Sequence, residues 1–148
     1  MVESAMRLPP EITGANPVEL MRGSVRNGAP GQMVSASLAK ATFLLCLRFG
    51  FSHVIVTCRE PVDLMYRAYQ FDDLLAGDMI DLSYSPGVKH KVLCLPIAAA
   101  AERWKTTNPP LFDFMFNSHH PDIDLDHAAI RQQFDELLAG SDRQSEPI

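Results

Sequence analysis

The middle of the chain alternates long apolar segments with short breaks. Between Ser35 and Gly50, apolar residues recur at the spacing of a helix, at Leu38, Ala41, Leu44, Leu45 and Phe49. Ser35 or Ser37 can cap this helix, and Gly50 can end it. The next segment, residues 51–58 (FSHVIVTC), is rich in β-branched residues and nearly all apolar. It predicts a central strand covered on both faces, and a second helix is expected over residues 61–71.

The N-terminal part of the chain is interrupted by prolines and glycines. Residues 1–10 (MVESAMRLPP) predict a short strand that Pro9 and Pro10 terminate. Residues 16–24 predict a short helix, with Asn16 as its N-cap and Pro17 in the first helical position. Residues 25–35 contain glycines and a proline, which is typical of a loop.

The second half of the chain predicts two strands followed by helices. Residues 79–86 and 90–97 have strand-like patterns, and the Pro86-Gly87 dipeptide between them is typical of a turn. Helical patterns follow, in residues 97–107, 110–120 and 126–140. We therefore predict an α/β protein with a mixed sheet. Its α/β core spans residues 1–97, a helical C-terminal extension spans 98–140, and residues 141–148 form a disordered tail.

Composition narrows the class of protein. The chain has 148 residues, of which 47% are hydrophobic and 21% charged, which is typical of one globular domain. The net charge of −5 argues against nucleic acid as a main partner. Each of the three cysteines lies in an apolar segment, which predicts reduced, buried thiols and a cytoplasmic location. The sequence has no apolar run long enough to span a membrane and no signal-peptide pattern.

The order of elements around Tyr66 resembles the second half of the GCN5-related N-acetyltransferase fold. In that family a short helix after a central strand carries a tyrosine, followed after three residues by Gly-Phe. The segment TCREPVDLMYRAYQFDD places Tyr66 on the tyrosine and Phe71 on the phenylalanine, with Arg59 and Gln70 in place of the family's Asn and Gly. The resemblance implies an N-acyltransferase-like fold. It also implies that two strands diverge around the acyl donor and that Tyr66 protonates the leaving thiolate.

A narrower resemblance is to N-acyl amino acid synthases and acyl-homoserine-lactone synthases. The segment AAAAERWKTTNPPLFDFMFNSHHPDI looks like the helical appendage of those enzymes, and ESAMR loosely resembles their Glu-x-Ser-Arg motif, with one additional residue between Glu3 and Arg7. The resemblance covers residues 1–123 and leaves the family's first half without a counterpart. It implies transfer of a fatty acyl group from acyl carrier protein or CoA to a small amine such as an amino acid. Glu3 would join Tyr66 as a catalytic residue, and no metal or redox cofactor would be needed.

The resemblance also implies a binding site for the phosphates of the acyl donor. A helix N-terminus offers unpaired N–H groups and a partial positive charge, and glycine lets the backbone approach an anion closely. The residues expected to bind the donor are Arg22, Arg26, Gly28, Gly31, Ser35 and Ser37. The same loop and arginines are also typical of a solvated connection, and Tyr66 could simply flank the apolar stripe of its helix.

Two other kinds of function are compatible with the sequence. A metal-dependent hydrolase could use the cluster from His119 to His127, whose imidazoles and carboxylates suit Zn, Fe or Mn, although these residues lack helical ligand spacing. Alternatively, the chain is a non-catalytic, truncated acyltransferase-like module that binds an acyl carrier or a partner chain. Half of such a sheet exposes a strand edge, so a homo-oligomer is a further expectation. His53 as a base and Cys58 as a nucleophile are weaker candidates, since no partner residue supports them.

Overall fold

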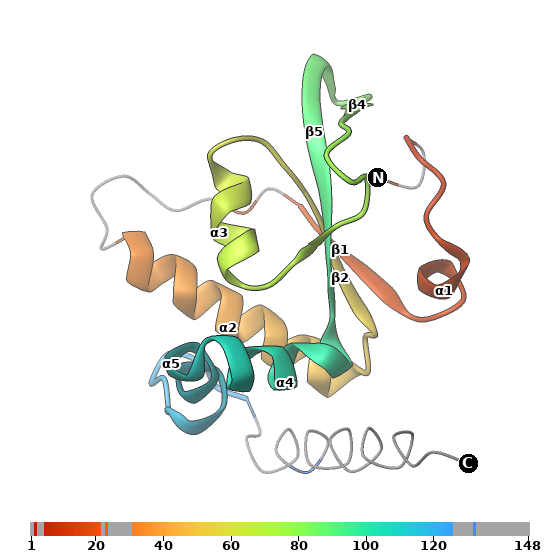
Figure 1. The fold of residues 1–148 in the computed structure, drawn as a ribbon. Coiled ribbons are helices and arrows are strands. Elements are labelled where there is room, and N and C mark those ends of the chain that lie inside the picture. The colour runs from red at the N-terminus through yellow and green to blue at the C-terminus, as the bar shows by residue number, and fades with distance from the viewer. Residues whose placement is uncertain (1, 3–4, 22, 24–30, 126–131, 133–148) are drawn as a thin grey trace.

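The computed structural model describes residues 2, 5–21, 23, 31–125 and 132 (Figure 1). The elements follow one another along the chain as α1 (Pro10–Thr13), β1 (Pro17–Leu20), α2 (Gly31–Phe49), β2 (His53–Cys58), α3 (Val62–Ala68), β3 (Asp72–Asp73), β4 (Ile80–Leu82), β5 (Ser85–Pro96), α4 (Ile97–Thr107), α5 (Pro109–Phe112) and the π-helical turn η2 (Asp113–Asn117). Except for Gln132, the predicted helix over 126–140 and the predicted tail lie outside the described residues.

The strands form an open mixed sheet in the order β1-β2-β5-β3, with β4 paired to β5. β1 and β2 are parallel and are connected through α2, whereas β2 and β5 are antiparallel along the whole of β2, from His53↔Pro96 to Cys58↔Lys91. The predicted α/β class, the mixed sheet, and the helix and strand at the centre of the chain are therefore confirmed.

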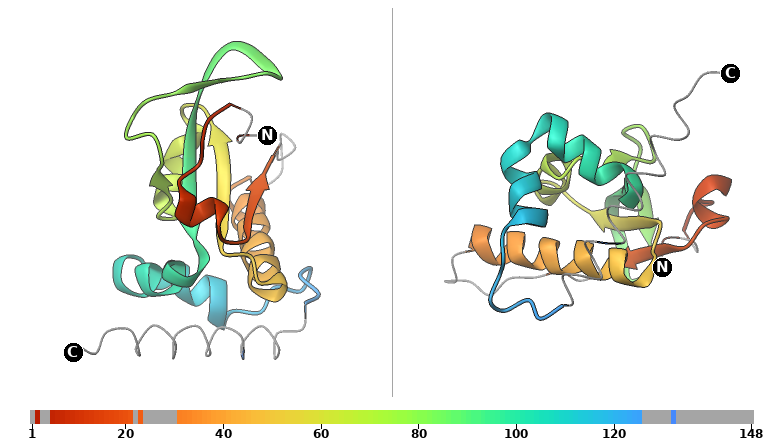
Figure 2. Two further views of the ribbon diagram at one scale, coloured as in Figure 1. Left: turned by 90° about the vertical axis from the view of Figure 1, so that its right-hand side faces the viewer. Right: turned by 90° about the horizontal axis from the view of Figure 1, so that it is seen from below.

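The two faces of the sheet are covered by different parts of the chain. Alternate residues of β2 and β5, including Val54, Val56 and Leu93, pack with α2, α4 and η2 in the larger core. The intervening residues, including Ile55 and Val92, pack on the opposite face against the N-terminal segment. In Figures 1 and 2, α2, α3 and α4 lie on one side of the strands and α1 lies on the other. β2 is thus a central strand with apolar residues buried on both faces, as its composition predicts.

The helical segment after β5 shares its core with the α/β part of the chain. The Trp104 ring lies 4.8 Å from that of Phe43 on α2, measured between ring centroids. The side chain of Lys40, also on α2, is buried, with only 1% of the residue exposed. Its Nζ donates hydrogen bonds to the Phe114 carbonyl at 2.6 Å and to the Ser118 carbonyl. These contacts hold η2 against α2, so the predicted boundary at residue 97 runs through one continuous core.

Four local predictions are wrong in the described residues. Neither Ser35 nor Ser37 caps the long helix, because α2 already begins at Gly31 and both serines lie inside it. Pro17–Leu20 is a strand, because Asn16 bonds to Ser52 and Gly50 next to β2 instead of capping a helix. Proline is tolerated there because it is the first residue of the strand. The described part of residues 1–10 contains no strand, and Pro10 begins a helix. The β4–β5 turn lies at residues 83–84, between the paired Leu82 and Ser85, so residues 86–87 belong to β5.

Replacing Lys40 with methionine should destabilise the fold. The variant removes a charged donor from two carbonyl oxygens near the end of η2, and hydrogen bonds to charged groups contribute roughly 2 kcal/mol each. We expect a loss of about that size in the free energy of unfolding, measured by urea titration. Lys105→Met, on the exposed side of α4, is the matched control and should change little. Equal losses in both variants would contradict a specific role for Lys40.

Candidate functional site

The parallel pair of strands separates near the middle of the sheet. Within the described residues, β1 and β2 are paired from Pro17↔His53 to Leu20↔Val56, and β2 then continues for two residues that pair only with β5. At Thr57 and Cys58 the sheet therefore lacks the neighbour that β1 provides earlier. This is where a ligand can approach the edge of β2.

Backbone hydrogen bonds show which residues of β2 face that edge. Ile97 N donates to Ser52 O at 2.9 Å, so the Ser52 carbonyl points toward β5. By the alternation of an antiparallel strand, the peptide groups of Val54 and Val56 point the same way. The hydrogen bond from Leu74 N to Val92 O on the far side of β5 agrees with this alternation. Thr57, by the same alternation, directs its peptide groups toward the side where β1 has ended.

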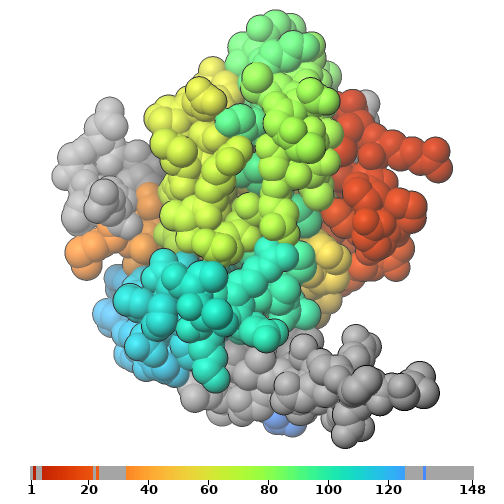
Figure 3. All heavy atoms as spheres, in the orientation of Figure 1, coloured from red at the N-terminus to blue at the C-terminus, as the bar shows by residue number. Residues whose placement is uncertain are grey.

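A pocket of about 800 Å³ opens at this point, between α2, α3 and the sheet. Its apolar lining includes Phe43, Val54, Met65, Phe71, Leu95 and Trp104. Its polar lining includes Thr57, Arg59, Glu60 and His90 around the end of β2, Ser35 and Thr42 on α2, and the tyrosines Tyr66 and Tyr69. Pockets of this size and composition typically bind small molecules or cofactors. Figure 3 shows α3 and the segment after it lying across this face of the molecule, with α4 and α5 below them.

Tyr66 reaches the pocket from the last turns of α3. Its ring packs edge-on against Phe71, with 5.2 Å between ring centroids. Burial raises the pKa of the Tyr66 phenol, and the neighbouring Cys58 and Tyr69 raise it further. The phenol is therefore protonated at neutral pH and can donate a proton. Gln70, which follows α3, has a φ of +64°, in the left-handed region where glycine is the least costly residue.

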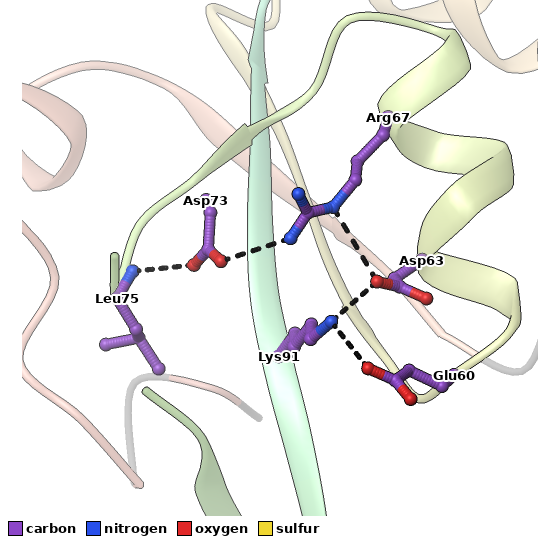
Figure 4. A network of polar contacts seen from close by, with 6 residues as sticks. All are labelled: Glu60, Asp63, Arg67, Asp73, Leu75 and Lys91. Carbon is purple, nitrogen blue, oxygen red and sulfur yellow. Dashed lines mark hydrogen bonds and ion pairs between the residues drawn. The ribbon is translucent and has the colours of Figure 1, made fainter. Parts of the chain in front are cut away.

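The start of α3 is fixed to the sheet by a network of charges (Figure 4). Lys91 Nζ on β5 donates to Asp63 Oδ2 at 2.6 Å and to Glu60 Oε1 at 3.1 Å. Arg67 lies 3.6 Å from both Asp63 and Asp73, so the network extends to β3. The hydrogen bond from Lys91 holds the pKa of the Asp63 carboxyl below its ordinary value, and the same contact raises the pKa of Lys91.

The end of α3 is fixed by α4. Trp104 Nε1 donates to the Tyr69 carbonyl at 2.9 Å, and Arg103 donates to the Gln70 carbonyl at 3.1 Å. Arg103 also forms an ion pair of 2.8 Å with Asp72 at the start of β3. Tyr66 therefore lies between two anchored ends of a short helix, and its position is set by β5 and α4 together.

The other predicted site residues are distributed differently. Glu3, Arg22, Arg26 and Gly28 lie outside the described residues, and Gly31 is the first residue of α2. Ser35 lines the pocket. Ser37 does not line it, because its Oγ donates to Met33 O on its own helix and bonds His120 Nε2 on the C-terminal segment, both at 2.9 Å.

The contacts of Cys58 and His53 give little support to a nucleophile or a base at these two positions. Cys58 lines the pocket, but burial and the Asp63 carboxylate raise the pKa of its thiol to about 11, so it is not a thiolate at neutral pH. His53 bonds Ser52 Oγ at 2.9 Å and lies outside the pocket lining. No three His, Cys, Asp or Glu side chains in the described part of the chain could hold a metal ion together. Asp126 and His127 of the proposed metal cluster lie outside that part.

The sequence patterns do not single out several polar residues of the pocket, among them Thr57, Glu60 and His90. Arg59 stands where the family has Asn, a position that gives no sign of a role in binding. His90 stands in a strand-like segment, where its alternation with Val92 and Cys94 gives no sign that it borders a pocket.

Comparison with known proteins gave no match, neither with a family model nor with a curated protein or a solved structure. Among the described residues, no helix is both long and apolar enough to cross a membrane.

The Asp63 ion pair should make stability depend on acid pH. Because the folded-state pKa of Asp63 is lowered, the carboxylate stabilises the fold above its ordinary pKa of 3.8, and this contribution is lost as pH falls through the folded-state value. Asp63→Asn should therefore be less stable than wild type at pH 7, and the difference should shrink as pH falls below about 4. Urea unfolding across this pH range measures it. Asp78→Asn, on an exposed loop, is the control, and a difference for Asp63→Asn that is independent of pH would contradict the ion-pair assignment.

Proposed function

We propose that this chain is an N-acyltransferase that moves a fatty acyl group from a carrier thioester, on acyl carrier protein or CoA, to an amine such as an amino acid. The observation that carries the proposal is the pocket beside the end of β1, which combines a largely apolar lining with the protonated phenol of Tyr66. Ligands of open α/β sheets characteristically bind at such strand ends.

The arrangement of the elements supports an N-acyltransferase-like fold. A parallel pair of strands connected by a long helix separates after four residues, and the short helix that follows carries a tyrosine beside the gap. Gln70 supports the same alignment, because it stands where the family has glycine and adopts the left-handed conformation that glycine favours. Both observations concern the segment on which the resemblance depends.

The lining of the pocket suits an acyl thioester. Phe43, Trp104 and Met115 provide apolar surface for a hydrocarbon chain, away from the polar groups at the end of β2. The N-terminus of α2, with Ser35, would bind the phosphates of the donor, and the resemblance adds Arg22, Arg26, Gly28 and Gly31 to the proposed phosphate site. Ser37, which the resemblance also implies, is bonded to Met33 O and His120 instead. Glu3 stays a proposed catalytic residue on the family resemblance alone.

The reaction requires one proton at the departing sulfur. The amine nitrogen attacks the thioester carbonyl, a C–N bond forms, and the C–S bond breaks. Tyr66 donates its phenolic proton to the sulfur, so a thiol leaves instead of a thiolate. The raised pKa means that the phenol is protonated at neutral pH, so the proton is present when the C–S bond breaks.

An arginine among the residues that line the pocket favours an acceptor with a carboxylate. Arg59 is exposed, and its guanidinium makes no hydrogen bond or ion pair with the residues that the structure describes. Guanidinium binds carboxylate through two parallel hydrogen bonds, which is the geometry an amino acid can offer. We therefore propose an amino acid, with its carboxylate on Arg59, as the acceptor.

Tyr66→Phe should lower kcat for acyl transfer by roughly a hundredfold or more, the usual contribution of a positioned general acid. The assay follows thiol release from decanoyl-CoA in the presence of glycine, with product identified by mass spectrometry. Tyr84→Phe removes a phenol that does not line the pocket but bonds Thr57 Oγ1 at 3.1 Å, so it controls for the loss of a hydroxyl near the site and should retain activity. If wild-type protein binds decanoyl-CoA or acyl carrier protein without turnover, the chain is the non-catalytic module and this proposal fails.

Arg59→Gln should raise the KM for glycine by roughly tenfold and leave the KM for glycinamide, which lacks the carboxylate, near its wild-type value. The loss corresponds to one charge-assisted contact of about 1.5 kcal/mol. Arg48→Gln, which removes an exposed cation outside the pocket lining, is the matched control. Equal effects of Arg59→Gln on both acceptors would contradict carboxylate binding at this residue.

A further inference from the structure

His90 is a buried imidazole on β5 that borders the same pocket as Tyr66. Only 8% of the residue is exposed. Its Nδ1 lies 2.8 Å from the carbonyl oxygen of Val88. A carbonyl oxygen can only accept a hydrogen bond, so Nδ1 carries a hydrogen, and in the neutral ring Nε2 carries the lone pair. Among the residues that the structure describes, Nε2 has no hydrogen-bond partner.

His90 and Tyr66 come to the pocket from opposite faces of the sheet. Along β5, His90 alternates with Lys91 and lies on the same face as Val92 and Cys94, which pack against the N-terminal segment. Tyr66 lies on α3, which covers the other face. Both residues line the pocket, which lies where the described pairing of β1 with β2 ends.

We propose that His90 is the general base that removes a proton from the attacking amine. The proposal rests on the function proposed above and adds the group that activates the acceptor. As the C–N bond forms, the amine proton moves to Nε2 of His90, while Tyr66 gives its proton to the departing sulfur. The proton on His90 then returns to the Tyr66 phenolate through solvent, so that both residues regain their starting states. The net reaction converts a thioester and an amine into an amide and a thiol.

The other candidate bases near the pocket already form hydrogen bonds. Glu60 and Asp63 both accept hydrogen bonds from Lys91. His53 bonds Ser52 and does not line the pocket. Within the described residues, His90 therefore offers the uncommitted basic nitrogen at the edge where the acceptor would bind.

The test compares donor binding with acyl transfer in His90→Asn. The asparagine amide can take the place of Nδ1 and still donate to Val88 O, but it provides no basic nitrogen in place of Nε2. With decanoyl-CoA as donor, we expect transfer to glycine at pH 7 to fall by roughly a hundredfold. The affinity for decanoyl-CoA should stay close to the wild-type value, because donor binding does not need the base. His53→Asn is the matched control and should retain both donor binding and transfer.

His90→Gln is the second variant, to be used where His90→Asn does not fold. In a third variant, His90→Ala, added imidazole should restore part of the transfer to glycine. Unchanged transfer to glycine in the variants would overturn the base assignment and leave the proposed function intact. A loss of decanoyl-CoA binding that accounts for the lost transfer, without rescue by imidazole, would also overturn it, since His90 would then serve packing or donor binding. If wild-type protein transfers decanoyl groups to no amine, the proposed function itself fails, and the role of His90 fails with it.

Discussion

The parallel pairing between β1 and β2 ends after four residues, while β2 stays paired with β5 to its last residue. A strand edge that loses its neighbour leaves backbone N–H and C=O groups to be satisfied by something other than the sheet. In this chain the edge at Thr57 and Cys58 borders a pocket. The site thus depends on a difference in length between two neighbouring strands, with helices positioned around the place where the shorter one ends.

The position of α3 depends on charges that are removed from water. Asp63 is buried, and its Oδ1 has no hydrogen-bond partner among the described residues, while Oδ2 accepts from Lys91. A buried ion pair gives little net stability compared with apolar packing, but removing one partner leaves the other charge without compensation. Such a pair therefore disfavours other positions of α3 more than it strengthens the fold. That property suits a helix whose tyrosine must face a pocket.

Local patterns predicted the elements whose formation is decided locally. The apolar periodicity of α2, its end at Gly50 and the β-branched run of β2 are all visible in the sequence. Pro17 is different, because proline is accepted both at the first position of a helix and at the first residue of a strand. Pairing with β2, more than thirty residues away, decides between them. The β4–β5 turn was misplaced for a related reason, since its position is set by the register of the hairpin and not by the Pro86-Gly87 dipeptide.

Residues of the candidate site could be predicted only where the adjacent sequence carries a recognisable pattern. Tyr66 could be singled out because its spacing to Phe71 resembles a family pattern, and the structure places it on the pocket. The burial of Lys40 could not be foreseen, because its acceptors lie 74 and 78 residues further along the chain. His90 was missed for the same reason, since a strand alternation cannot show which residues border a pocket built from distant segments.

The helical segment after β5 is a structural part of the proposed site. Trp104 and Met115 line the pocket, Trp104 bonds the end of α3, and Lys40 holds η2 against α2. Part of the apolar wall of the pocket is therefore built by the C-terminal part of the chain. Since the strands provide the polar groups and the helices after them provide the apolar wall, the pocket forms only when both parts of the chain fold around the same core.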